Sequence, residues 1–144
     1  MVHELIAINV RGQEYRVNVQ GVREIRGWSP ETRLPHAPDF VRGVVNLRGA
    51  VLPIIDLGLL LGFETAEPTP RHAILVVEVG ETLVGLLVDA VSDIFKAKDA
   101  EIQDLPNAAT DEAREFVSGI IPSGNRLIGL LNIKSLMPKM ADAA

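Results

Sequence analysis

Hydrophobic and polar residues alternate in short runs along much of the chain. Residues 15–19 alternate in this way, and Gly12 separates them from an earlier apolar run at 5–10. A period of two predicts strands, and a glycine between two such runs predicts a hairpin. Comparable runs, rich in Val, Ile and Leu and bounded by Gly, Pro or Asn, occur at 44–47, 51–55, 73–79, 83–88, 116–121 and 127–131. The pattern therefore predicts a protein dominated by strands.

The same pattern of residue types occurs twice. Residues 40–57 register on 116–133 without a gap, and residues 5–25 register on 74–94. Any two strands can be aligned by chance, but two matches in the same order favour a duplication with two similar lobes. The aligned pairs include Phe40 with Phe116, Gly43 with Gly119, Val22 with Val91, Ile25 with Ile94, and Asp56 with Asn132.

Short helices are expected at a few places between the strands. Asp56 and Asn132 each precede a short apolar run, and their side-chain oxygens suit the N-cap position of a helix. Thr110 or Asp111 is a candidate cap for a further helix that ends at Phe116.

A Pro-rich stretch divides the chain. Residues 64–71 contain Pro68 and Pro70 and are the best linker candidate. We expect one domain over 1–144 with approximate lobes at 5–62 and 72–137, because 144 residues suit a single domain with a sizeable core.

Composition narrows the classes of function. The formal net charge is −5, and no basic stripe is present, so nucleic acid is not an expected partner. The chain has no cysteine, which excludes disulfides and thiolate sites and agrees with a reducing compartment. It shows no signal-peptide pattern and no apolar stretch long enough to span a membrane. We expect a cytoplasmic protein that does not insert into the membrane.

Candidate catalytic residues are few. His3, His36 and His72 lie far apart and lack metal-ligand spacing. No serine occupies a G-x-S-x-G turn, and no glycine-rich phosphate loop occurs. We expect neither a metal nor a cofactor. A small-ligand-binding or enzymatic barrel with a site assembled from isolated residues is the alternative from another class.

Two charged residues stand among apolar neighbours. Arg48 follows a valine-rich run in Asn46-Leu47-Arg48-Gly49, and Glu24 lies between Val22 and Ile25. A guanidinium and a carboxylate at strand ends can form a charge-assisted pair, although two separately solvated charges are an equal alternative. Trp28, the only tryptophan, is expected first to cover the core and second to contact a partner.

Taken together, five motifs resemble those of CheW, the coupling protein family of bacterial chemotaxis. They are VREIRGW at 22–28, TRLPHAPDFVRGVVNLRGAVLPIIDL at 32–57, VGLLVDAVSDI at 84–94, FVSGI at 116–120 and RLIGLLNIKSLM at 126–137. The resemblance implies an all-β fold of two five-stranded SH3-like barrels around a shared core, with short helices. It also implies a non-enzymatic adaptor that joins the histidine kinase CheA to the cytoplasmic tips of chemoreceptors, recruited to receptor clusters at the inner membrane.

The resemblance also implies where partners bind. Glu24 and Arg48 match the family's characteristic acidic and arginine residues, and Val22, Gly43 and Ile94 fall where its receptor-coupling surface is expected. Residues 103–109 lack the basic and aromatic residues that some relatives use in extended arrays, which puts such ring contacts in doubt. A regulatory module of the CheV type, or of the kinase itself, is the alternative within the family.

The duplication suggests a geometry for the receptor site. Val22 and Ile25 in one half correspond to Val91 and Ile94 in the other, and equivalent strand ends of two lobes tend to meet near their common axis. Apolar residues there would form a groove suited to a helix. The alternative is that all four side chains belong to the ordinary core.

Overall fold

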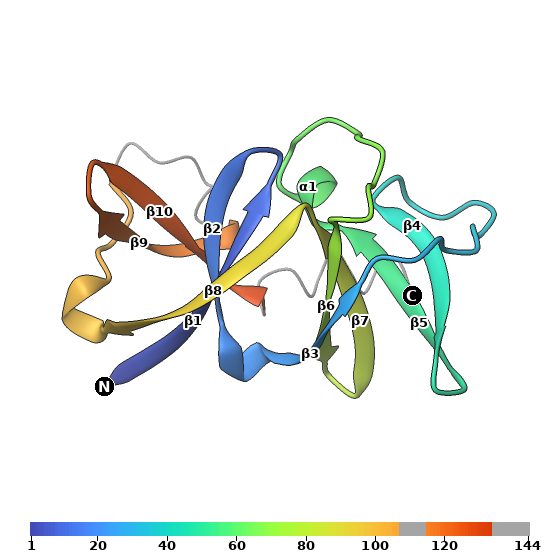
Figure 1. Ribbon diagram of the computed structural model, residues 1–144, viewed down its shortest axis with the longest axis horizontal. Helices are drawn as coiled ribbons and strands as arrows, with labels where there is room; N and C mark the ends of the chain where they lie inside the picture. Colours follow the sequence, from blue (N-terminus) through green and yellow to red (C-terminus); the bar gives the residue numbers. More distant parts are fainter. Residues whose placement is uncertain (107–114, 134–144) are drawn as a thin grey trace.

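The computed structural model describes residues 1–106 and 115–133, which form strands with a few short helical turns (Figure 1). The strands are β1 (Val2–Val10), β2 (Gln13–Asn18), β3 (Val22–Gly27), β4 (Val41–Leu47), β5 (Ala50–Asp56), β6 (Ala73–Val79), β7 (Thr82–Val88), β8 (Ala90–Lys98), β9 (Val117–Ser123) and β10 (Arg126–Leu131). The helical turns are η1 (Val19–Gly21), α1 (Leu57–Leu60) and η2 (Asp99–Glu101). The all-β fold expected from the alternating pattern is confirmed.

Two five-stranded sheets make up the molecule. The first sheet has the order β8-β1-β2-β10-β9, and the second sheet has the order β3-β6-β7-β5-β4. The chain passes from the first sheet to the second through η1 and returns between β7 and β8 (Figure 1). Each sheet therefore takes strands from both halves of the chain. The approximate lobes 5–62 and 72–137 do not coincide with the sheets, because each half gives its first two strands to one sheet and its last three strands to the other.

The pairing of strands follows the internal repeat. Leu130 of β10 lies opposite Arg16 of β2, and Ile54 of β5 lies opposite Gly85 of β7, both in parallel pairs. These are the pairs that the two sequence registers place in correspondence. The sheets thus share strand order as well as register, which generic strand patterning does not require.

Irregularities repeat as well. β4 has an extra residue between Val41 and Gly43, and β9 has one between Val117 and Gly119. In addition, the backbone amide of Asp56 donates to the carbonyl of Phe40 and that of Asn132 donates to Phe116, at 2.7 and 2.9 Å. Bulges are specific local features, so their recurrence at matched positions supports the duplication.

A shared core joins the two sheets. The first sheet contributes Ile6, Ile8 and Val17, and the second contributes Leu75 and Leu86, all 3% exposed or less. The second sheet also encloses a core of its own, against which Trp28 packs, and the first sheet encloses a smaller one around Leu5. Burial of apolar side chains between the sheets is the main force that holds them together.

The expected N-caps have different outcomes. The Asp56 side chain accepts a hydrogen bond from the amide of Leu59 and begins α1, as predicted. The helices expected after Asn132 and after Thr110 or Asp111 lie outside the described residues, apart from their first or last residues.

Candidate partner-binding surface

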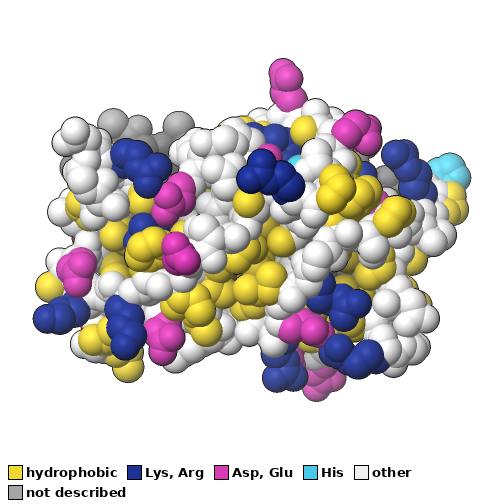
Figure 2. Space-filling view, viewed as in Figure 1, with side chains coloured by type: hydrophobic (Ala, Val, Ile, Leu, Met, Phe, Trp, Pro, Cys, Tyr) yellow, Lys and Arg dark blue, Asp and Glu magenta, His cyan; other side chains and the backbone are white. Residues whose placement is uncertain are grey.

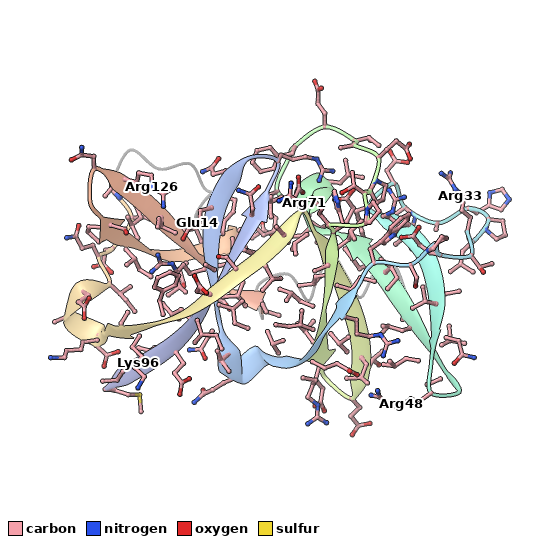
Figure 3. The ribbon with its side chains drawn as sticks, in the orientation of Figure 1. Glu14, Arg33, Arg48, Arg71, Lys96 and Arg126 are labelled. Atoms are coloured by element: carbon pink, nitrogen blue, oxygen red, sulfur yellow. The ribbon has the colours of Figure 1, made fainter. Side chains whose placement is uncertain are left out.

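Arg48 lies at the tip of the β4–β5 hairpin. Leu47 pairs with Ala50, which leaves Arg48 and Gly49 as the two turn residues, with φ of 49° and 86°. Two positive φ angles are typical of a type I′ hairpin turn. The Asn46 side chain accepts a hydrogen bond from the Gly49 amide at 2.8 Å and closes the turn. The turn holds Arg48 at the surface, and Figure 3 labels it beside the tip of the hairpin.

Arg48 and Glu24 form an ion pair. Arg48 Nη2 donates to Glu24 Oε1 at 2.6 Å, and the two side chains are 68% and 30% exposed. The hydrogen bond from Arg48 holds the pKa of Glu24 below its ordinary value against some desolvation, and the charges of Arg48 and Arg26 act in the same direction. The pairing expected from the sequence is therefore present, and it links strands β3 and β4–β5 at opposite edges of the second sheet.

The ion pair has no counterpart in the first sheet. In the alignment of the two repeats, Asp93 corresponds to Glu24 and Gly124 corresponds to Arg48. The β9–β10 turn therefore has glycine where the β4–β5 turn has arginine. A five-stranded sheet of the same register therefore forms without such a pair. This argues that closing the sheet does not require Glu24 and Arg48.

The four expected groove residues divide into two kinds. Val22 and Val91 are half-buried and pack against the shared core. Ile25 and Ile94 are 45% and 58% exposed, which is unusual for large apolar side chains on strands. The core alternative thus describes part of the role of Val22 and Val91, whereas Ile25 and Ile94 are largely exposed, although they pair with Leu75 and Ile6 of the shared core.

These residues lie on edge strands of different sheets. Ile94 belongs to β8 at the edge of the first sheet, and Ile25 belongs to β3 at the edge of the second. Figure 2 shows hydrophobic side chains gathered on the middle of the face where Figure 1 places β8 and β3. Exposed apolar side chains on edge strands are suited to contact a partner.

Gly43 differs from the other expected binding residues. It is buried with φ of 145°, and a Cβ added there would lie 2.2 Å from the carbonyl oxygen of Thr32. Thr32 and Val44 exchange backbone hydrogen bonds of 2.8 Å across this close approach. The backbone geometry therefore gives Gly43 a structural role, and its surface is not open to a partner.

A second arginine, Arg11, which sequence reasoning missed, forms a largely buried ionic cluster. Arg11 Nη2 donates to both carboxylate oxygens of Asp56, at 3.2 and 3.0 Å, and Nη1 donates to Asp89 at 3.2 Å. Nε donates to the backbone carbonyl of Glu64 at 3.0 Å. A signal for Arg11 was available, because Asn9-Val10-Arg11-Gly12 has the same spacing as the Asn46-Leu47-Arg48-Gly49 turn.

Residues 1–106 and 115–133 contain no group of three or more His, Cys, Asp or Glu side chains placed to hold a metal ion. His72 Nδ1 accepts a hydrogen bond from the amide of Thr69 at 3.0 Å, so its role here is to close a turn. In the same part of the chain, no helix has the length and apolar character needed to cross a bilayer.

An exposed ion pair beside apolar side chains on two edge strands is typical of a protein-binding module. Comparison with known proteins agrees with this class. Residues 4–140 match the CheW-like domain. The chemotaxis protein CheW of Rhizobium meliloti strain 1021 is 53% identical over 135 residues, which cover 94% of this chain and 87% of that protein. The probable chemotaxis protein CheW of Rhizobium etli is 49% identical over 141 residues, which cover 98% and 91%.

A solved structure supports the fold. The scaffolding protein TtCheW from Thermoanaerobacter tengcongensis superposes with a TM-score of 0.83 at 26% identity, covering 92% of this chain and 90% of that one. The chain therefore belongs to the CheW-like family of chemotaxis scaffolding proteins.

Proposed function

We propose that this protein is a non-enzymatic adaptor that couples the cytoplasmic tips of chemoreceptors to the histidine kinase CheA. The proposal rests on family membership over residues 4–140 together with the exposed Glu24–Arg48 pair, which the fold does not require. Exposed charges of this kind contribute little to stability, and they set specificity and association rate in complexes. The adaptor would work in the cytoplasm, recruited to receptor clusters at the inner membrane.

The receptor site of this proposal is the face where β8 and β3 present Ile94 and Ile25. A receptor tip is a helical hairpin, and an apolar helix face can bind between two strand edges by helix-in-groove recognition. Val22 and Val91 would form the floor, since they are half-buried on the shared core, and Glu24 with Arg48 would border the site. A few desolvated contacts would supply most of the binding energy.

An adaptor is distinguished by its ability to bind the receptor and the kinase at the same time. A receptor-tip fragment fixed to beads should retain CheA from the same organism only when this protein is added, and kinase activity in the captured complex should differ from that of free CheA. Equal retention of CheA without the protein, or no retention with it, would contradict the proposal.

The remaining alternatives give different results. A regulatory module of the CheV type or of the kinase would bind one partner without bridging. A ligand-binding or enzymatic barrel would show a thermal shift with a nucleotide or metal ion, whereas an adaptor should show none.

A further inference from the structure

The β1–β2 turn carries an arginine where the matching turn of the repeat carries glycine. Arg11 has φ of 51°, and its counterpart Gly80, in the β6–β7 turn, has φ of 63°. A left-handed backbone conformation is unfavourable for residues with a Cβ and neutral for glycine. Unlike glycine, the arginine has a side chain whose interactions can offset this backbone strain.

That side chain crosses from the first sheet to the second. Arg11 belongs to the β1–β2 turn, whereas Asp56 ends β5 and Asp89 follows β7. The Arg11 and Asp56 side chains are 14% and 1% exposed, so the pair is largely removed from water. Two carboxylates and a carbonyl converge on one guanidinium, and hydrogen bonds from all three of its nitrogens fix direction as well as distance.

A glycine next to the second sheet leaves space for the guanidinium of Arg11. A Cβ on Gly58, in α1, would lie 2.8 Å from Arg11 Cζ, so only glycine leaves the space for the guanidinium where it lies. Beside it, the Asp89 amide donates to the carbonyl of Asn9 at 2.9 Å, and His72 Nε2 lies 3.8 Å from the Asp89 carboxylate. The cluster therefore sits where the chain returns from the second sheet to the first.

The matching place at the other crossover is different. Gly80, Asn132 and Gln20 stand where Arg11, Asp56 and Asp89 stand at the first crossover. An open pocket of about 520 Å³ is lined by Gln20, Asn132 and their neighbours. One end of the contact between the sheets thus has a directional ionic cluster, and the other end has a hollow.

We propose that Arg11 is a latch that fixes the angle between the two sheets and thereby positions the partner-binding face. The shared core is apolar, and apolar packing is less directional than the charge-assisted hydrogen bonds of Arg11. Ile94 and Ile25 lie on different sheets, so their relative position depends on that angle. A binding site held in one geometry in advance gains affinity because less order is lost on binding. This inference rests on the proposed function, and Arg11 acts as a positioning residue without contact to the partner.

The absence of native cysteine allows a direct test. Spin labels on Leu127→Cys in the first sheet and Val51→Cys in the second occupy side chains that are 68% and 73% exposed. Arg11→Met should broaden the distance distribution between the labels and weaken binding of a receptor-tip fragment on the order of fivefold. Gly58→Ala, which displaces the guanidinium and changes no charge, should broaden it too.

Arg126→Met is the matched control. Arg126 is 64% exposed and pairs with Glu14 at 2.8 Å within the first sheet, where Figure 3 shows both side chains. It should leave both the distance distribution and the affinity unchanged. If Arg11→Met does not fold, Arg11→Lys takes its place, because one ammonium cannot satisfy two carboxylates and a carbonyl in the same geometry.

Two results would overturn the latch. An unchanged distance distribution in the Arg11 variant, even with a lower melting temperature, would make Arg11 an ordinary stabilising residue. A broadened distribution with unchanged affinity would remove its role in positioning. If the wild-type protein binds no receptor fragment, the proposed function fails, and the label distances still decide whether Arg11 fixes the sheets.

Discussion

Arg11 and Arg48, in the two Asn-x-Arg-Gly turns, have the same local geometry but different interactions. Arg11 and Arg48 have nearly the same φ, 51° and 49°, and each turn is closed by an asparagine side chain. Arg11 is directed inward to buried carboxylates, whereas Arg48 stays 68% exposed beside Glu24. The same turn chemistry therefore yields a structural contact in one hairpin and a surface charge in the other.

Arg48→Ala and Glu24→Ala should weaken capture of receptor or kinase by about tenfold while the melting temperature changes by only about 1–2 °C. The reason is that an exposed pair contributes little to folding, whereas a partner senses its charge. Titration calorimetry and thermal denaturation would measure the two effects. Arg126→Ala is the control, because the Arg126 side chain is about as exposed as that of Arg48 and also forms an ion pair. Normal binding with earlier melting in both variants would assign Glu24 and Arg48 to the fold.

Gly43→Ala should destabilise the protein by about 3 kcal/mol or prevent folding, because the new Cβ would clash with the Thr32 backbone and φ of 145° is unfavourable for alanine. Gly124→Ala is the matched control. Gly124 also has positive φ but nothing lies near its Cβ position, so a loss of roughly 1 kcal/mol is expected. Chemical denaturation would compare them. A stable Gly43→Ala variant that fails only in partner binding would restore Gly43 to the binding surface.

Glu31 should make the stability depend on acidity. Burial alone would raise the pKa of Glu31, but hydrogen bonds from Trp28, its own backbone and Arg42, with the charge of Arg42, hold that pKa below its ordinary value. A carboxyl group with a lowered pKa in the folded state stabilises above its unfolded pKa, and this is lost as pH falls through the folded value. Melting temperatures of the wild type should therefore decline below the ordinary glutamate range. Glu31→Gln should decline less steeply, and equal slopes would be evidence against this role.

At the scale of elements, the edge strands β3 and β8 carry the apolar part of the proposed site. Most residues of both strands are exposed, and charged residues such as Arg23 and Lys96 alternate with apolar ones. Charges on an edge strand discourage pairing with other chains, which leaves the isoleucines free to contact a helix. Both isoleucines are largely exposed because they lie on edge strands, where a side chain has a neighbouring strand on one side only.

Ile25→Asp and Ile94→Asp should each reduce receptor binding by at least about tenfold while circular dichroism and kinase binding persist. Both side chains are exposed, so a carboxylate there remains hydrated. Leu127→Asp, on an exposed position of β10, is the control for tolerance of a charge. Val22→Asp belongs to a different class, since Val22 packs on the shared core and should lower stability too. Unaltered receptor binding by both isoleucine variants would exclude this face.

At the scale of the whole molecule, the two halves of the chain are interdependent, because each sheet combines two strands from one half with three from the other. β1 and β2 require β8 and β10 as neighbours, and β3 requires β6. A single half of the chain therefore holds hairpins without complete sheets, and isolated hairpins are marginally stable. The shared core adds to this, since both sheets bury side chains against it.

Fragments 1–65 and 66–144 should each be largely unfolded by circular dichroism, and mixing them should restore sheet structure with one cooperative melting transition. The intact protein should also unfold in one transition. A fragment that folds alone with a melting transition of its own would show that the halves are independent units, contrary to the strand order observed.

The sequence by itself determined the strands, the repeat and the register. Alternation of apolar residues specifies which face of a strand is buried, and this information is local, so hairpins such as β1–β2 follow the pattern. The resemblance also identified Glu24 and Arg48, which do pair. Only the tertiary structure decided which strands share a sheet, because that depends on how η1 and the β7–β8 connection cross between sheets.

The tertiary structure also decided which individual residues are buried. Nothing local distinguishes Ile25 from Val22 on β3, yet one is exposed and the other packs on the core. Gly43 matched a binding motif, but its close contact with Thr32 comes from a segment that periodicity does not place. The partners of Arg11 are 45 and 78 residues away, and only the packing of the two sheets brings Asp56 and Asp89 to it. Local pattern specifies strands, whereas contacts between distant segments determine what each exposed or buried charge does.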